Sequence, residues 1–152
     1  MCIEMQQTLI LLKPDAIHRR LAGAILQRFE QKGLRLVGMK LVQPDRPLAE
    51  KHYAVHKGKP FYDSLLQFLT SGPSLAVVLE GREAVTVVRE MMGKTDGAKS
   101  PAGTIRGDYG ISVQNNLIHG SDSPENAAAE IALWFRPNEL LSYNLVDQSW
   151  IG

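Results

Sequence analysis

The chain has 152 residues, of which 44% are hydrophobic and 22% are charged, as is typical of one globular domain with a buried core. Seventeen basic and sixteen acidic residues give a net charge of +1, so the overall charge favours neither nucleic acid nor an anionic membrane as a partner. The single cysteine, Cys2, excludes an intrachain disulfide and a cysteine-based zinc site. Because no leader pattern and no membrane-length apolar run is visible, we expect a cytoplasmic protein.

Strand and helix signals alternate through the first half of the chain. The apolar run Thr8–Lys13 predicts a short buried strand. Pro14 and Asp15 are typical of a helix start, and apolar residues at steps of four from Leu21 extend this helix until Gly33 ends it. The elements expected next are a strand over 34–42, a polar helix from a turn at 44–47 through 56, a helix over 61–69 and a strand over 75–79.

The second half contains a long segment without periodicity. A helix is expected over 82–92, followed by a glycine-rich loop over 94–116 of the kind that usually has a function. A short strand around 117–118 and a helix from the Ser123–Pro124 cap to residue 135 complete the order. This order predicts a single α+β domain with a small antiparallel sheet.

Among the histidines, His119 is the strongest candidate for chemistry. It follows an apolar strand, and Gly120 leaves room for another group to approach the ring. A turn histidine bonded to a backbone carbonyl is equally compatible with this pattern. The i, i+4 spacing of His52 and His56 suits a metal, but no acidic or histidine partner lies at ligand spacing, so an ordinary helix face is favoured there.

Several cations stand in turns or beside glycines. Lys13 closes the first strand, Arg89 lies on the helix before the long loop, and Arg106 lies within that loop. Lysine offers phosphate a point charge and arginine offers it a planar fork. Each residue alone is more typical of a surface charge, whereas their convergence on His119 would create a cationic pocket.

The segment Asn116–Asp122 (NLIHGSD) resembles the active-site signature of the nucleoside diphosphate kinases. Further segments resemble blocks of the same family in the same order: Leu12–Asp15, Arg28–Gly33, His52–Tyr53, Lys59–Phe61, Ser71–Pro73, Gly103–Asp108 and Glu130–Phe135. The resemblance extends from about Thr8 to Trp150. A single block would be weak, but the ordered set is highly specific.

The resemblance implies a ferredoxin-like α+β sandwich, with a four-stranded antiparallel sheet and helices on one face. It implies transfer of the γ-phosphate of a nucleoside triphosphate to a nucleoside diphosphate, by a ping-pong mechanism through a phosphohistidine at His119. Little preference for base or sugar is expected. Mg²⁺ would be bound mainly through the nucleotide phosphates, with few direct protein ligands. No residue is assigned as a ligand, and Asp122 could act through water.

The same resemblance assigns roles to individual residues. Glu130 would hold the second ring nitrogen of His119, Ser121 would be a hydrogen-bond partner near the histidine, and Tyr53 would hydrogen-bond into the site. The positions that match phosphate-binding residues are Lys13, Arg89, Thr95 and Arg106. Lys13 and Asn116 would also reach the sugar, while Phe61 and Val113 would contact the two faces of the base.

The resemblance also bears on assembly and on the chain ends. The tail over 138–152 is similar to that of long-tailed hexameric members, so we expect a homohexamer rather than a tetramer. Asp96–Gly97 replaces a frequent Asn-Pro, and the glycine is expected to loosen the loop. Residues 1–7 precede the usual family start and are expected to form a flexible extension.

Two other functions compete with an active kinase. A non-catalytic relative that only binds nucleotide would have lost chemical positions, yet His119, Lys13 and Arg106 are all present. A nucleic-acid-binding module would need aromatic side chains on a central strand, and the strand over 75–79 has none. The expected partners are therefore nucleoside di- and triphosphates, with no membrane and no indication of nucleic acid.

Overall fold

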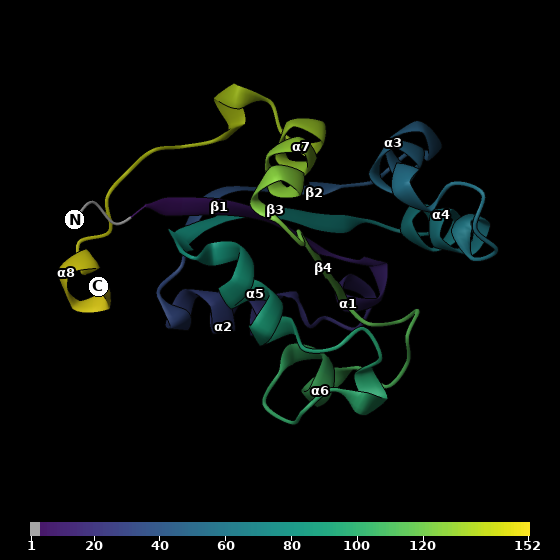
Figure 1. The fold of residues 1–152 in the computed structure, drawn as a ribbon, viewed down its shortest axis with the longest axis horizontal. Helices are drawn as coiled ribbons and strands as arrows, with labels where there is room; N and C mark the ends of the chain where they lie inside the picture. Colours follow the sequence, from purple (N-terminus) through teal and green to yellow (C-terminus); the bar gives the residue numbers. More distant parts are fainter. Residues whose placement is uncertain (1–3) are drawn as a thin grey trace.

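A computed structural model describes residues 4–152 and is built around one antiparallel sheet (Figure 1). Its strands are β1 (Met5–Leu12), β2 (Arg35–Val42), β3 (Ser74–Arg82) and β4 (Ile118–Gly120). They lie in the order β2-β3-β1-β4, and every neighbouring pair is antiparallel. The predicted ferredoxin-like α+β fold with a four-stranded sheet is thus confirmed.

Helices cover both faces of the sheet, so the expectation of helices on one face is wrong. One face packs against α1 (Pro14–His18), α2 (Ala22–Lys32) and α5 (Ala84–Met92), and the other against α3 (Arg46–His52), α4 (Tyr62–Thr70) and α7 (Pro124–Trp134) (Figure 1). The physical reason lies in the central strands. In β1, Ile10 and Leu12 enter one core while Leu9 and Leu11 enter the other, and a strand buried on both faces is continuously apolar.

The first predicted strand and helix differ from the structure at their ends. Residues 5–7 belong to β1 and pair with residues 80–82 of β3, so the expected flexible extension is wrong for these three residues. These residues are polar or exposed and join the sheet through backbone pairing. The sequence therefore shows no apolar run that would predict a strand there. Residues 1–3 lie outside the described part. The predicted helix is split into α1 and α2 by a turn in which Arg20 has a φ of 58°.

The segment over 94–116 is more regular than predicted. It contains a 3₁₀ turn, η2 (Gly97–Lys99), and a short helix, α6 (Ile105–Tyr109), whose N-cap Thr104 accepts a hydrogen bond from the Gly107 amide. One helical turn is too short to give a periodic signal. Gly97 does not loosen this segment: a Cβ there would lie 2.5 Å from the Gly110 backbone, so glycine is required for close packing.

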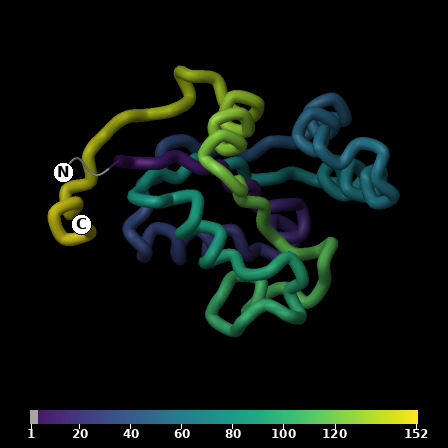
Figure 2. Tube along the Cα trace, in the orientation of Figure 1, coloured from purple at the N-terminus to yellow at the C-terminus, as the bar shows by residue number. Residues whose placement is uncertain are grey.

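The C-terminal segment runs back along the edge strand β2 before ending in α8 (Gln148–Ile151), as Figure 2 shows. It first forms the 3₁₀ turn η3 (Pro137–Glu139), and the Leu141 amide then donates to the Val37 carbonyl. A further 3₁₀ turn, η1 (Ala54–His56), follows α3. Within residues 4–152, no helix has the length and apolar character needed to cross a membrane.

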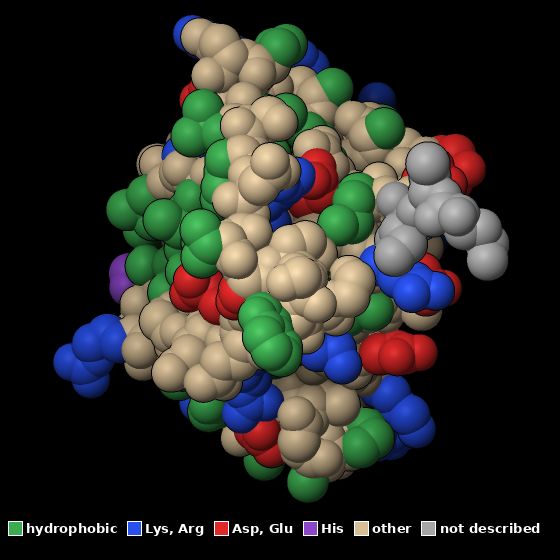
Figure 3. Space-filling model, turned by 90° about the vertical axis from the view of Figure 1, so that its left-hand side faces the viewer, with side chains coloured by type: hydrophobic (Ala, Val, Ile, Leu, Met, Phe, Trp, Pro, Cys, Tyr) green, Lys and Arg blue, Asp and Glu red, His purple; other side chains and the backbone are tan. Residues whose placement is uncertain are grey.

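The face near the chain ends carries basic and acidic side chains interspersed with apolar ones (Figure 3). No continuous basic surface is visible on this face. Such a surface is the electrostatic footprint expected of a nucleic-acid-binding protein.

Candidate active site

His119 lies in the middle of the short edge strand β4, opposite Leu11 of β1. The two residues that precede it, Leu117 and Ile118, are fully buried and anchor the strand. Gly120 serves packing: a Cβ there would lie 2.4 Å from the Met92 sulfur of α5. We expected Gly120 to leave room beside the His119 ring. In the structure its lack of a side chain instead allows β4 to pack closely against α5.

The His119 ring is held by a carboxylate. Its Nε2 lies 2.7 Å from Oε2 of Glu130 in α7, and the Ser121 hydroxyl donates to the same oxygen over 2.9 Å. Because a carboxylate only accepts hydrogen bonds, Nε2 carries the proton in the neutral ring and Nδ1 keeps its lone pair. Ser121 is fully buried and bonds to Glu130 rather than to the ring, so it acts on His119 through the carboxylate.

A cavity of about 680 Å³ opens beside His119, a volume suited to a small ligand. Nine of the eleven predicted site residues line it: Lys13, Tyr53, Phe61, Arg89, Thr95, Arg106, Val113, Asn116 and His119. The other two, Ser121 and Glu130, lie behind the histidine. Residues from the end of β1, the start of α4 and the segment over 94–116 thus meet at one place, although they are far apart in the sequence.

The cavity is cationic. Lys13 and Arg106 are buried, Arg89 lines the same wall, and no acidic side chain of residues 4–152 lines this cavity. Burial lowers the pKa of Lys13 to about 8, with Asp15 opposing the shift and Arg106 adding to it. Burial and the neighbouring Arg89 lower the pKa of Arg106 to about 10. Positive charge is concentrated here on a chain whose net charge is only +1.

A polar network fixes these cations before any ligand is bound. The Lys13 ammonium donates to the Asn116 side-chain oxygen, and the Asn116 amide donates to the Thr95 carbonyl over 3.0 Å. The Arg106 guanidinium donates to the backbone carbonyls of Asn116 and Ile118. Side chains that are already oriented lose little entropy when a phosphate arrives.

The rim of the cavity is apolar and accessible. Phe61, just before α4, is 46% exposed, and Val113 is 58% exposed. Apolar side chains left exposed around a polar cavity are suited to contact a flat ring. Tyr53 also lines the cavity, and burial raises its pKa to about 12, so the phenol keeps its proton and can donate.

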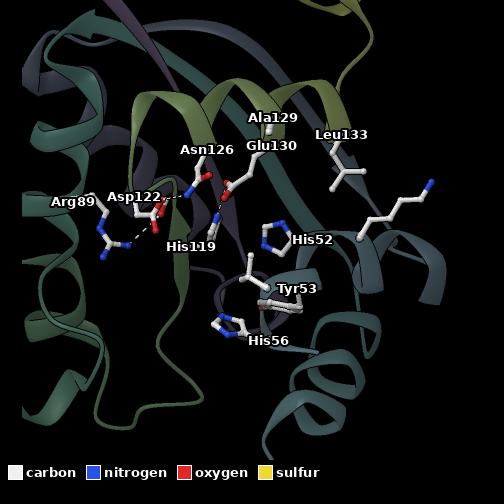
Figure 4. A pocket seen from close by; sticks show the side chains of 13 residues that line it. His52, Tyr53, His56, Arg89, His119, Asp122, Asn126, Ala129, Glu130 and Leu133 are labelled. Carbon is white, nitrogen blue, oxygen red and sulfur yellow. Dashed lines mark hydrogen bonds and ion pairs between the residues drawn. The ribbon is translucent and has the colours of Figure 1, made fainter. Parts of the chain in front are cut away.

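His52 forms a cluster with His119 and Glu130 that the sequence did not predict. Figure 4 shows His52 of α3 beside His119 and Glu130, along an adjoining cavity of about 380 Å³ that shares His119 with the first. The centroids of the His52 and His119 rings lie 4.5 Å apart. Each of the three residues offers one possible metal-ligand atom, and these atoms lie within 4.8 Å of one another. His56, the partner weighed from the sequence, instead lies near Phe61.

The tautomer of His52 disfavours a metal at this cluster. The Trp134 indole donates to Nδ1 of His52 over 3.2 Å, which places the His52 proton on Nε2. A metal on Nε2 would take the place of that proton and leave the neutral ring protonated on Nδ1. Nδ1 could then no longer accept the hydrogen bond from the Trp134 indole. Burial, together with the nearby His119, lowers the pKa of His52 well below its usual range, so the ring is neutral. No local sequence pattern indicates this contact, because it joins residues 67 positions apart.

Comparison with known proteins agrees with the geometry. The family model described as nucleoside diphosphate kinase matches residues 6–140. Relatives named nucleoside diphosphate kinase from Carboxydothermus hydrogenoformans and Thermomicrobium roseum are 56% and 54% identical over 97% of this chain and 99% of theirs. The solved halophilic nucleoside diphosphate kinase from Halobacterium salinarum in complex with CDP is 44% identical, with a TM-score of 0.96 over 98% of this chain and 99% of that one. The chain therefore belongs to the nucleoside diphosphate kinase family, and it is a nucleotide-binding phosphotransferase.

Proposed function

We propose that the enzyme transfers the γ-phosphate of a nucleoside triphosphate to a nucleoside diphosphate in two steps, through a phosphohistidine on Nδ1 of His119. The single observation that carries this proposal is the 2.7 Å contact between Nε2 of His119 and Glu130. It leaves Nδ1 with a lone pair and gives the ring proton an acceptor. A neutral imidazole held in this way is a good nucleophile near neutral pH.

In the first step, Nδ1 attacks the γ-phosphorus as the bond from phosphorus to the bridging oxygen breaks, and the nucleoside diphosphate leaves with that electron pair. The ring gains positive charge, which the Glu130 carboxylate stabilises through Nε2–H. In the second step, a terminal phosphate oxygen of another nucleoside diphosphate attacks the phosphorus and the bond to Nδ1 breaks. Lys13, Arg89 and Arg106 neutralise charge on the transferring group, because phosphoryl transfer demands mainly positioning and electrostatic stabilisation.

The remaining predicted residues have roles that fit their positions. Thr95 and the three cations would hold the phosphates, Lys13 and Asn116 the sugar hydroxyls, and Tyr53 would donate a hydrogen bond beside His119. Ser121 would keep the Glu130 carboxylate oriented. All but Ser121 and Glu130 line the one cavity, and that convergence supports these assignments.

Broad tolerance for bases fits the rim of the cavity. Phe61 and Val113 can contact a base only through its faces, and every base has a π-face. Mg²⁺ would enter with the nucleotide and neutralise its β- and γ-phosphates. This fits a cavity that lacks an acidic lining within residues 4–152, because Mg²⁺ is often held by substrate phosphates and water. Asp122 lies along the smaller cavity and would act only through water.

We also propose that the chain is one domain that assembles as a homohexamer in the cytoplasm. The similarity of the tail over 138–152 to that of long-tailed hexameric members supports the hexamer. Light scattering tests it: a mass near six subunits agrees with the proposal, and a mass near four contradicts it.

A two-step labelling experiment tests the activity. The protein is incubated with γ-labelled ATP and Mg²⁺, separated from nucleotide and checked for acid-labile, base-stable label, and GDP is then added. Label that forms on the protein and moves to GTP is expected, while His119→Gln should remain unlabelled. Bound nucleotide without label would favour a non-catalytic nucleotide-binding protein.

A further inference from the structure

Asp15 has a role that its position in the sequence does not suggest. It occupies the second position of α1, where an acid ordinarily serves the helix dipole. In the structure, one carboxylate oxygen, Oδ2, accepts a hydrogen bond from the Leu117 amide over 3.0 Å. The other, Oδ1, is buried and has no hydrogen-bond partner within residues 4–152. The carboxylate therefore faces the protein interior beside the candidate site.

The backbone that Asp15 holds is strained. Leu117 has a φ of 74°, and the Ile118 amide donates to the Asn116 carbonyl over 2.8 Å, which together describe a γ-turn with positive φ. Such a conformation is costly for a residue other than glycine and persists only where its surroundings enforce it. Here the Leu117 amide is held by Asp15 and its carbonyl by the Lys13 amide, 2.9 Å away.

This turn connects two parts of the site. Asn116, at its start, orients the Lys13 ammonium, and Ile118, at its end, begins the strand that carries His119. The short segment from Lys13 to Asp15 thus holds the turn that leads to the nucleophile.

Asp15 also bears on the charge of Lys13. Within residues 4–152, two other titratable groups face Lys13 from neighbouring elements, Arg106 of α6 and His52 of α3. Burial and Arg106 both disfavour the ammonium form, and His52 is neutral. Asp15 is the acidic group that favours the charged form. A phosphate-binding lysine must be charged when its ligand arrives, and this carboxylate helps to keep it so.

We propose that Asp15 is a positioning residue for nucleotide binding, which holds the strained turn at Leu117 and keeps the Lys13 ammonium charged for the phosphates. The inference rests on the proposed phosphate-binding role of Lys13.

Three variants separate the two parts of this role. Asp15→Asn keeps an oxygen that can accept from the Leu117 amide but removes the charge. Asp15→Ala removes both. Asp63→Asn is the matched control, because Asp63 is an exposed acid at the second position of α4 and forms no hydrogen bond or ion pair within residues 4–152.

The first measurement needs no nucleotide and no activity. Trace labelling with an amine reagent across a range of pH, followed by peptide mass spectrometry, gives the pH at which Lys13 loses its proton. We expect this midpoint to move to lower pH in Asp15→Asn and to stay unchanged in Asp63→Asn. A Lys13 midpoint that is the same in Asp15→Asn and the wild type overturns the inference.

The second measurement is the affinity for Mg-ADP at pH 6.0 and pH 7.5. Loss of an adjacent opposite charge lowers a pKa by about one unit or more, which reduces the charged fraction of Lys13 at pH 7.5 by about threefold and hardly changes it at pH 6.0. Asp15→Asn should therefore bind about threefold more weakly at pH 7.5 and normally at pH 6.0. Asp15→Ala should bind more weakly at both, because the turn is released.

The outcomes distinguish this inference from the proposed function. Equal weakening of Asp15→Asn at both pH values overturns the inference, because a purely structural defect would not depend on the charge of Lys13. A shifted Lys13 midpoint with unchanged affinity at pH 7.5 overturns it as well. In that case the fault lies in the proposed role of Lys13, and Lys13→Met would also bind Mg-ADP normally.

Discussion

The charged side chain of Lys13 should destabilise the folded protein. The perturbation is Lys13→Met, which keeps the length and apolar volume of the side chain while removing its charge. In the folded protein, burial lowers the pKa of Lys13 to about 8, whereas the unfolded chain has an ordinary lysine. The folded state therefore binds the proton more weakly, and the charged group costs stability wherever the unfolded chain is protonated. The contribution of Lys13 to the free energy of unfolding should rise with pH between about 8 and 10.5 and change little above that range.

The magnitude follows from the shift. A pKa lowered from 10.5 to about 8 corresponds to about 3 kcal/mol at pH 7. The lost hydrogen bond to Asn116 offsets about 1 kcal/mol of this, so Lys13→Met should be about 2 kcal/mol more stable than the wild type at pH 7. Between pH 7 and pH 9 the wild type should recover about 1.4 kcal/mol of the difference.

The assay is denaturant unfolding of both proteins at one protein concentration, without nucleotide, at pH 7, 9 and 10.5. Comparing the two proteins at each pH cancels the contribution of titrating groups that do not interact with Lys13. A variant that is less stable than the wild type at pH 7, or a difference that does not shrink as the pH rises, would refute the electrostatic reasoning.

The remaining predictions concern activity and binding. His119→Ala should abolish exchange while leaving nucleotide affinity within about twofold, and measurable turnover in this variant would remove His119 from the nucleophile role. Glu130→Ala should slow the first phosphoryl transfer by about 10- to 100-fold in single-turnover measurements, because it orients the ring without touching the phosphate; a wild-type rate would show that Glu130 is only structural. Phe61→Ala should raise KM more than it lowers kcat and should do so for purine and pyrimidine nucleotides alike, so an unchanged KM would argue against stacking.

Much of the fold was predictable from local patterns. The apolar runs before Lys13 and around Val77 indicated buried strands, and the structure places both in the centre of the sheet. The Ser123–Pro124 pair located the start of α7, where the Ser123 hydroxyl accepts from the Asn126 amide. The burial of both sheet faces was not predicted correctly, although continuous apolar strands are its usual sign. The helix α6 and the polar start of β1 gave no periodic signal.

Local sequence patterns predicted less of the candidate site than of the fold. The pattern around His119 left a catalytic and a turn histidine equally open, and the roles of Glu130 and Ser121 came from the family resemblance. Only the fold revealed that Ser121 bonds to the carboxylate, that His52 lies against His119, and that Asp15 holds a turn 102 positions away. These contacts depend on strand order and on helix packing, which spacing along the chain does not encode.

The central claim is that Nδ1 of His119 receives the phosphate while Glu130 holds Nε2. NMR spectroscopy of the enzyme labelled with ¹⁵N-histidine, after reaction with Mg-ATP and removal of nucleotide, reports which ring nitrogen is bonded to phosphorus. The structure predicts phosphorus on Nδ1 of a single histidine, with Nε2 still protonated. Phosphorus on Nε2, or on a histidine other than His119, would contradict the account.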